Sequence, residues 1–276
     1  MTSVAQPGAA LRFRGAWRNA FVHYVPALAV FVAVIVLWEV LVQALAIRRF
    51  ILPAPSAIGG AFVENFSTLL LPAARATLIE ALGGLVIGTV AGALAGFATA
   101  RWVTARDSLL PIAITLNSIP IIAFAPLMNN WFGILNPVAK MMIAAVLVFF
   151  PIMINVTRGL TQVEPAALEL MRSYAASEWT VLRKVRIPNA LPYFFTALKV
   201  GSTLSLIGAI VGEYFGGSSE VLGRVVVQSA SSLNFALTWA AILLAALTGI
   251  AVYLAIVYLE RRLIPWHASV RAAEGG

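Results

Sequence analysis

The residues that could do chemistry are few, and most of them lie near the ends of long apolar segments. Lys199 and Glu213 are the clearest pair, because a spacing of fourteen residues brings them within about 40 degrees of the same helix face, with Thr203 between them. About 21 Å separates them along the axis, so they cannot pair within one helix. We predict a polar stripe in which Lys199 reaches one membrane surface through its long stem and Glu213 faces a wet outer vestibule.

The remaining polar residues form no catalytic arrangement. His23 and His267 are isolated near segment ends, and Glu39 and Glu80 have the positions of residues that hydrogen-bond between helices or at the membrane surface. The chain has no cysteine and no Gly-x4-Gly-Lys-Ser/Thr phosphate loop. We therefore predict no catalytic residue, no metal site and no cofactor in this chain, which should not hydrolyse ATP itself.

The composition indicates a membrane protein. Hydrophobic residues make up 61% of the 276 positions and charged residues only 11%, against roughly 25% in an ordinary soluble domain. The mean hydropathy is +0.92. The net charge of +8 does not predict nucleic-acid binding, because the basic residues sit beside apolar segments rather than along one polar face.

The apolar segments predict an all-α integral membrane fold with six transmembrane helices, since about 20 apolar residues cross a bilayer. The expected spans are 26–46, 74–99, 108–128, 138–157, 191–215 and 236–259.

The basic residues predict the orientation of these spans. All but five of the 19 Lys and Arg fall on the side of the N-terminus, which the positive-inside rule makes cytoplasmic. We expect a cytoplasmic tail at 1–25 with a retained first helix, a transmembrane domain at 26–266 with a cytoplasmic loop at 158–190, and a cytoplasmic tail at 267–276. The five exceptions are Arg48, Arg49, Arg75, Lys140 and Arg224.

Prolines mark two irregular regions. Pro53 and Pro55 preclude a regular helix just after the first span, and Ser56 could cap a short, half-buried helix on the outer surface. In the third span, Pro111, Pro120 and Pro126 each remove a backbone donor. That span is either the kinked helix that lines a pathway or a plain proline kink packed against its neighbours. The first alternative makes Asn117, Ser118 and Pro120 candidate pathway residues, beside Lys199, Thr203 and Glu213 of the polar stripe.

Four glycines, at positions 84, 88, 92 and 96, recur at four-residue spacing and lie in one groove of the second span. Such a groove lets two helix backbones approach closely, so we interpret Gly84, Gly88, Gly92 and Gly96 as a packing seam. The seam could be internal or between subunits.

A polar, basic, helix-forming insert at 169–188 separates two apolar segments. It carries helix formers from Pro165 to Trp179, and we predict that it docks another protein. The alternative is an amphipathic helix that lies in the membrane surface. The candidate contact residues are Glu169, Arg172, Tyr174, Ala175, Ser177, Trp179 and Pro188.

The spacing of this insert resembles the EAA loop of ABC importer permeases, in which Glu-Ala-Ala is followed at fixed distances by Gly and by Ile-x-Leu-Pro. Glu169, Ala175, Val185 and Pro188 occupy the matching positions. Ala175 replaces the glycine, which makes a sharp turn there more costly. The other departures are Leu170, Met171 and Ile187.

The resemblance extends over about 51–266 to permeases for aliphatic sulfonates, taurine, nitrate and pyrimidine precursors. It implies a multi-pass protein of the bacterial inner membrane that pairs with a second permease copy, two cytoplasmic ATPases that hold ATP and Mg, and an external solute-binding protein. Ser118 after Asn117 gives no support for an anion-pairing residue there, which favours a neutral heteroaromatic cargo such as a pyrimidine or flavin precursor. The matching blocks are 52–56, 119–127, 131–133, 150–151, 191–192, 207–213 and 259–262.

Two other classes of protein remain open. A secondary transporter that works without an ATPase would be expected to show inverted repeats and ionisable groups at the midplane, whereas the charges here lie near span ends. A membrane enzyme would need polar residues that converge at one depth. Neither pattern is found in the sequence.

Overall fold

The computed structural model describes residues 9–117 and 119–265, and all of its regular elements there are helices. Five helical segments in this part of the chain are long and apolar enough to cross a membrane, at Val25–Ala44, Pro55–Arg101, Pro137–Thr161, Glu178–Phe215 and Phe235–Leu263. The six-span expectation is therefore met at five of its six positions. His267, Ser118 and the C-terminal tail lie outside the described residues.

The expected third span, 108–128, is not one helix. Helix α4 covers Val103–Asn117 and contains Pro111, and the chain then breaks before a short 3-10 turn, η2, at Ile121–Ala123. Helix α5 follows at Phe124–Phe132. Pro120, just before η2, has an extended backbone with ψ of 120°, so the chain does not enter η2 as a continuous helix.

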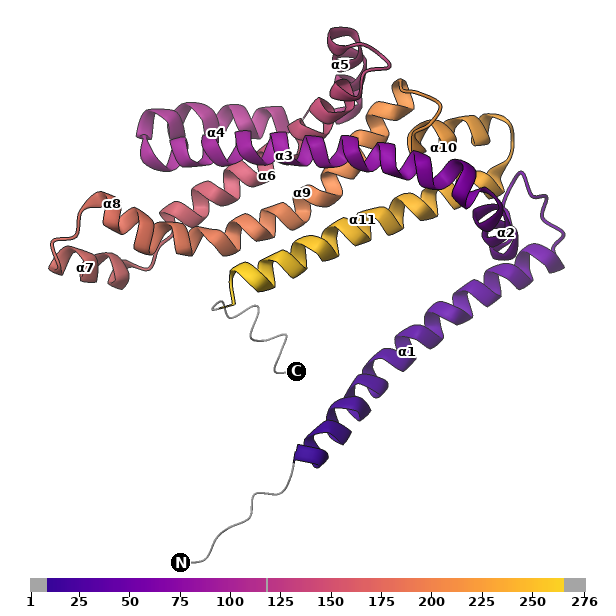
Figure 1. Ribbon diagram of the computed structural model, residues 1–276, viewed down its shortest axis with the longest axis horizontal. Coiled ribbons are helices and arrows are strands. Elements are labelled where there is room, and N and C mark those ends of the chain that lie inside the picture. Colours follow the sequence, from indigo (N-terminus) through magenta and orange to yellow (C-terminus); the bar gives the residue numbers. More distant parts are fainter. Residues whose placement is uncertain (1–8, 118, 266–276) are drawn as a thin grey trace, which may run out of the picture.

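The first long helix stands apart from the rest of the molecule (Figure 1). Helix α1 covers Ala9–Ala44, so it begins within the expected N-terminal tail. Its contacts with the body include the ring of Trp38, which meets Trp239 edge-on at 5.6 Å. Its residues from Val25 onward are largely exposed, as expected for a helix that faces lipid.

Helix α2, Pro55–Asn65, is the short helix expected after the first span. Ser56 does not cap it, because the helix begins one residue earlier. Instead the Glu39 carboxylate of α1 accepts from the Ser56 backbone N at 2.9 Å and from its hydroxyl at 2.7 Å. A carboxylate beside the free N–H groups of a helix start is a favourable arrangement. A π-helical turn, η1, at Phe66–Leu70 then continues directly into α3, Leu71–Arg101.

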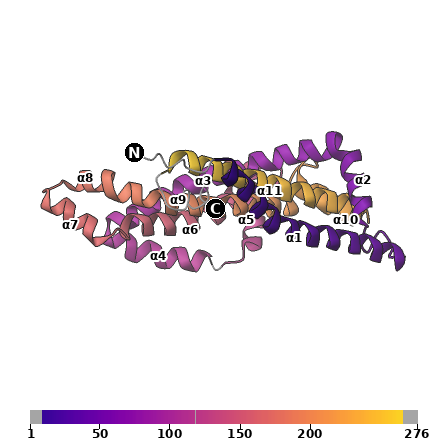
Figure 2. The same ribbon diagram turned by 90° about the horizontal axis from the view of Figure 1, so that it is seen from below.

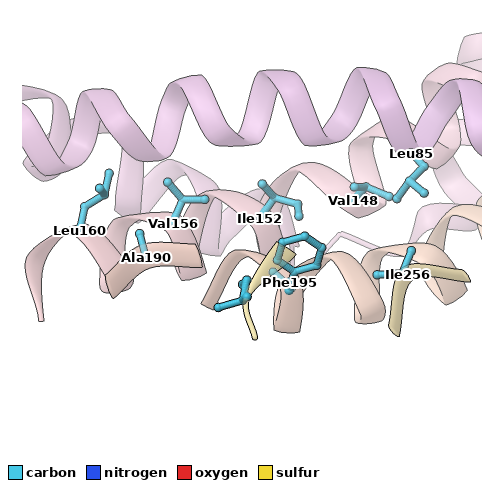
Figure 3. Close-up of a cluster of buried hydrophobic side chains, with 10 residues drawn as sticks. Leu85, Val148, Ile152, Val156, Leu160, Ala190, Phe195 and Ile256 are labelled. Atoms are coloured by element: carbon cyan, nitrogen blue, oxygen red, sulfur yellow. The ribbon is translucent and has the colours of Figure 1, made fainter. Parts of the chain in front are cut away.

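Three helices form the centre of the bundle, and a fourth covers one side (Figures 1 and 2). Helix α6, Pro137–Thr161, packs against both α3 and α9, Ile187–Phe215, while α11, Phe235–Leu263, contacts α9. Figure 3 shows side chains from these helices meeting in one apolar core. Its members are Leu85, Val148, Ile152, Val156, Leu160, Ala190, Phe195, Ala197, Ile256 and Ile264.

The glycine seam of α3 is internal. A Cβ added at Gly88 would lie 2.5 Å from the carbonyl oxygen of Ala145, and one added at Gly92 would lie 2.6 Å from that of Phe149. Gly84 and Gly96 face α6 in the same way. Because backbone atoms cannot move aside as a flexible side chain can, the α3–α6 contact depends on these missing side chains. The alternative of a seam between subunits is excluded.

Candidate functional site: the loop between α6 and α9 and the helices it joins

The loop begins with a short helix that ends in a defined cap. Helix α7 covers Pro165–Ser173, with Pro165 in its first turn, where a missing donor costs little. After it, the Ala176 N–H donates to the Met171 carbonyl at 3.0 Å, and the Ala175 N–H donates to that of Arg172 at 2.9 Å. These two bonds make a Schellman motif, whose residue Ala175 has φ of +46°. The sharp turn of the glycine-containing pattern is thus formed here by alanine.

The second half of the loop is the start of the next long helix. Ser177 caps α8, Glu178–Val181, by accepting from the Thr180 N–H at 3.3 Å. A π-helical turn, η3, at Leu182–Arg186 leads without interruption into α9. Pro188 and Pro192 lie within this continuous helix and do not separate the loop from the span. The wider π turn lies where a regular helix would clash with the proline ring.

Side chains of this second half connect the C-terminal end of α6 to the start of α9. These two helix ends are the stalks of the loop. The Asn189 amide donates to the Gly159 carbonyl at 2.7 Å and to the Gln162 carbonyl at 3.1 Å. The Arg186 guanidinium donates to the Leu160 carbonyl at 3.3 Å. These bonds satisfy carbonyls at the C-terminal end of α6 and fix them to the start of α9. The two ends of the loop are therefore joined to each other.

The tip of the loop exposes large side chains. The exposed fractions are 55% for Leu170, 75% for Tyr174 and 67% for Trp179, and Glu169 and Arg172 are exposed beside them. Aromatic and arginine side chains are enriched in protein–protein contacts. The tip thus has the composition of a docking surface.

Lys199 and Glu213 have separate roles in the structure. Lys199 forms an ion pair with Glu260 of α11, with 2.9 Å between Nζ and Oε2. Glu213 is fully buried, so the expectation that it faces a wet vestibule is wrong. Sequence reasoning did not find the partner of either residue, because the partners lie on helices whose neighbours cannot be read from spacing alone.

Glu213 belongs to a buried polar cluster at the end of the bundle opposite the loop. Its Oε2 accepts from the Gly223 N–H at 2.6 Å, at the start of α10, Leu222–Ser231. Glu80 of α3 and Lys140 of α6 are buried near it, as is Thr77 of α3, whose hydroxyl accepts from the Leu222 N–H at 2.9 Å. Lys140 donates to the Ile134 carbonyl. The cluster joins α3, α6, α9 and α10, and a favourable charge at a helix start contributes to it.

The other candidate pathway residues lie on open surfaces or at the break. Thr203 is on an exposed face of α9 that also carries Thr196, Val200 and Ile207, at spacings of three and four residues. Asn117 is the last residue of α4, and Pro120 is exposed just before η2. Of the predicted polar stripe on α9, only Thr203 faces outward on an uncharged surface.

Comparisons with known proteins identify the family. Residues 84–265 match the family described as binding-protein-dependent transport system inner membrane component. The chain belongs to this family. It is 32% identical to the riboflavin transport system permease protein RibX of Chloroflexus aurantiacus, over 85% of this chain and 87% of that protein. It is 29% identical to the formylaminopyrimidine transport permease protein ThiX of Halalkalibacterium halodurans, over 86% and 93% of the two chains.

Solved structures resemble this transport-family chain in fold. The inward-facing MetNI methionine ABC transporter has a chain with a TM-score of 0.54 and 21% identity, covering 70% of this chain and 98% of the other. A chain of an amino acid ABC transporter crystallised with histidines has a TM-score of 0.57 at 18% identity, covering 74% and 95%. The helical bundle is therefore a fold of ABC transporter permeases.

Proposed function

We propose that this chain is the permease subunit of an ATP-driven importer that takes up a small organic solute delivered by an external binding protein. The observation that carries the proposal is the capped, exposed loop tip, which lies between the ends of two membrane helices that are hydrogen-bonded to each other. A loop that transmits motion to membrane helices needs a source of energy. Membership of the binding-protein-dependent family supports an ATPase as that source.

In this mechanism, two cytoplasmic ATPase subunits hold ATP and Mg and bind the loop tips of two permease copies. Closing of the ATPases draws the tips together, and the cross-tied stalks pass the motion to α6 and α9. The exposed face of α9 around Thr203 would line the passage between the two copies. Both termini and the loop would then be cytoplasmic in a bacterial inner membrane, with the chain crossing it six times if α4 and α5 together complete one span.

The cargo we propose is a neutral nitrogen heterocycle. The exposed face of α9 at Thr196, Val200, Thr203 and Ile207 carries no charge, which suits an uncharged solute. Two relatives named above have riboflavin and formylaminopyrimidine in their names, which agrees with this class. A secondary transporter working without an ATPase is the alternative, and no feature of the loop favours it.

The test replaces Glu169 with Ala, or Ala175 with Asp, in the chain expressed together with its ATPase. Both variants should keep ATP hydrolysis but lose at least about tenfold in ATP-dependent uptake into vesicles, because a missing or repelled contact at a docking tip weakens coupling. Ser231→Ala, at an exposed position on α10, is the control and should transport normally. Normal uptake by both tip variants, or an ATPase that never copurifies with the wild type, would reject the proposal.

A further inference from the structure

A groove of about 480 Å³ lies beside the loop, apart from the exposed face of α9 described above, and it shares Trp179 with the exposed tip of the loop. It lies between the C-terminal end of α3, the end of α6 and the segment formed by α8 and η3. Its charged lining residues are Arg101, Arg186 and Glu178, so the groove has an excess of positive charge. Its other lining residues are Phe97, Ala100, Trp102, Leu160, Trp179 and Leu182.

The position of the groove along α3 matches the surface of a bilayer. The 20 residues from 81 to 100 carry no charge, and a helix of that length covers about 30 Å, the thickness of the hydrocarbon core. Glu80 precedes this run, and Arg101 follows it. Arg101 and the groove are therefore placed at the level of the lipid headgroups.

The lining of the groove has two chemical parts, as a phospholipid does. Phe97 and Leu182 supply an apolar floor, and Phe97 continues onto the exposed flank of α3, where Leu94 is 67% exposed. Trp102 and Trp179 stand at the rim with exposed fractions of 56% and 67%. Tryptophan is enriched at the headgroup level of membranes, and paired arginines bind phosphate oxygens through several donors.

We propose that this groove binds one anionic phospholipid of the same leaflet, with its phosphate between Arg101 and Arg186 and the upper part of an acyl chain along Phe97 and Leu182. A free phosphate would leave the apolar floor uncovered, and a protein partner would leave the lipid-facing flank of α3 unexplained. Because Arg186 also ties the loop to α6, the bound lipid contacts a residue that links the loop to the bundle.

The binding test uses the full-length chain in detergent and native mass spectrometry with phosphatidylglycerol or phosphatidylcholine. The wild type should retain one phosphatidylglycerol that the Arg101→Gln/Arg186→Gln variant binds at least about tenfold more weakly. The matched control is Arg48→Gln/Arg49→Gln, which removes two arginines from the connection between α1 and α2 and should bind as the wild type does. Phosphatidylcholine should not be retained in either case.

Four results would overturn the proposal. Equal lipid binding by the Arg101/Arg186 variant and the wild type would show that the groove is not the site, and equal loss in both double variants would indicate a general effect of charge. Displacement of the lipid by millimolar inorganic phosphate would indicate a simple anion site. A second measurement does not depend on the arginines: brominated phosphatidylglycerol should quench tryptophan fluorescence less in Trp102→Phe/Trp179→Phe, and unchanged quenching would also reject the site. Neither readout requires transport, so failure here leaves the proposed function standing.

Discussion

Ala175 shows how a single residue can meet a backbone requirement that its side chain opposes. Its φ of +46° lies in the left-handed region, which costs an alanine about 1 kcal/mol more than a glycine. The two hydrogen bonds of the α7 cap hold it there. A strained residue that persists at a candidate docking surface is a reason to test whether the strain matters.

We expect Ala175→Gly to stabilise the loop by about 1 kcal/mol, because glycine adopts the same φ without the Cβ clash. The measurement is the resistance of the loop to limited proteolysis, together with the thermal midpoint of the purified protein. Ala176→Gly is the matched control, since residue 176 is not among those with positive φ, and it should be neutral or destabilising. Equal behaviour of the two variants would argue against strain at Ala175.

At the scale of helices, close backbone contact replaces side-chain interlocking along α3 and α6. A Cβ added at any glycine of the seam would clash with a carbonyl oxygen or a Cβ of α6. On the other side of α6, a Cβ at Gly208 of α9 would lie 2.7 Å from the Cα of Ala144. Helix α6 is thus held closely on two sides by glycines from its neighbours.

Gly88→Ala should therefore push α3 away from α6 and lower stability by about 1–3 kcal/mol, the usual cost of overpacking a well-packed contact. The expected result is a lower thermal midpoint and a lower yield of monodisperse protein. Gly60→Ala in α2 is the control, because its added Cβ meets nothing within 4 Å, and it should be neutral or slightly stabilising. If both variants behave like the wild type, the close approach of α3 and α6 is not needed for folding.

At the scale of the whole molecule, one face of α9 is left open although α9 lies at the centre of the fold. Val200 and Ile207 are 50% and 51% exposed on that face, while the opposite side of α9 packs on α6 and α11. The proposed assembly explains this arrangement, since a second copy would meet the open face across the passage.

The natural absence of cysteine makes this arrangement directly testable. Thr203→Cys should form a disulfide-linked or bis-maleimide-linked dimer in membranes, because the same residue of two copies would face across the passage. The readout is a band of doubled mass on a denaturing gel. Ile250→Cys, at a 54% exposed position of α11, should remain monomeric under the same conditions. The opposite pattern would place the second copy on another face.

The sequence by itself determined the membrane class, five of the long helices, the family and the position of the loop between α6 and α9. It could do so because these depend on the lengths of apolar runs and on spacings along one chain. Only the tertiary structure decided that the glycine seam is internal, that Lys199 pairs with Glu260 and that Glu213 is buried in the cluster with Lys140 and Glu80. Periodicity fixes which residues share a face of a helix, but which helix covers that face depends on contacts between residues that are far apart in the chain. The chain breaks near Pro120 but stays helical through Pro188, although a proline removes one backbone donor in both places. The surrounding packing decides whether the chain bends at the proline or a wider π turn accommodates it.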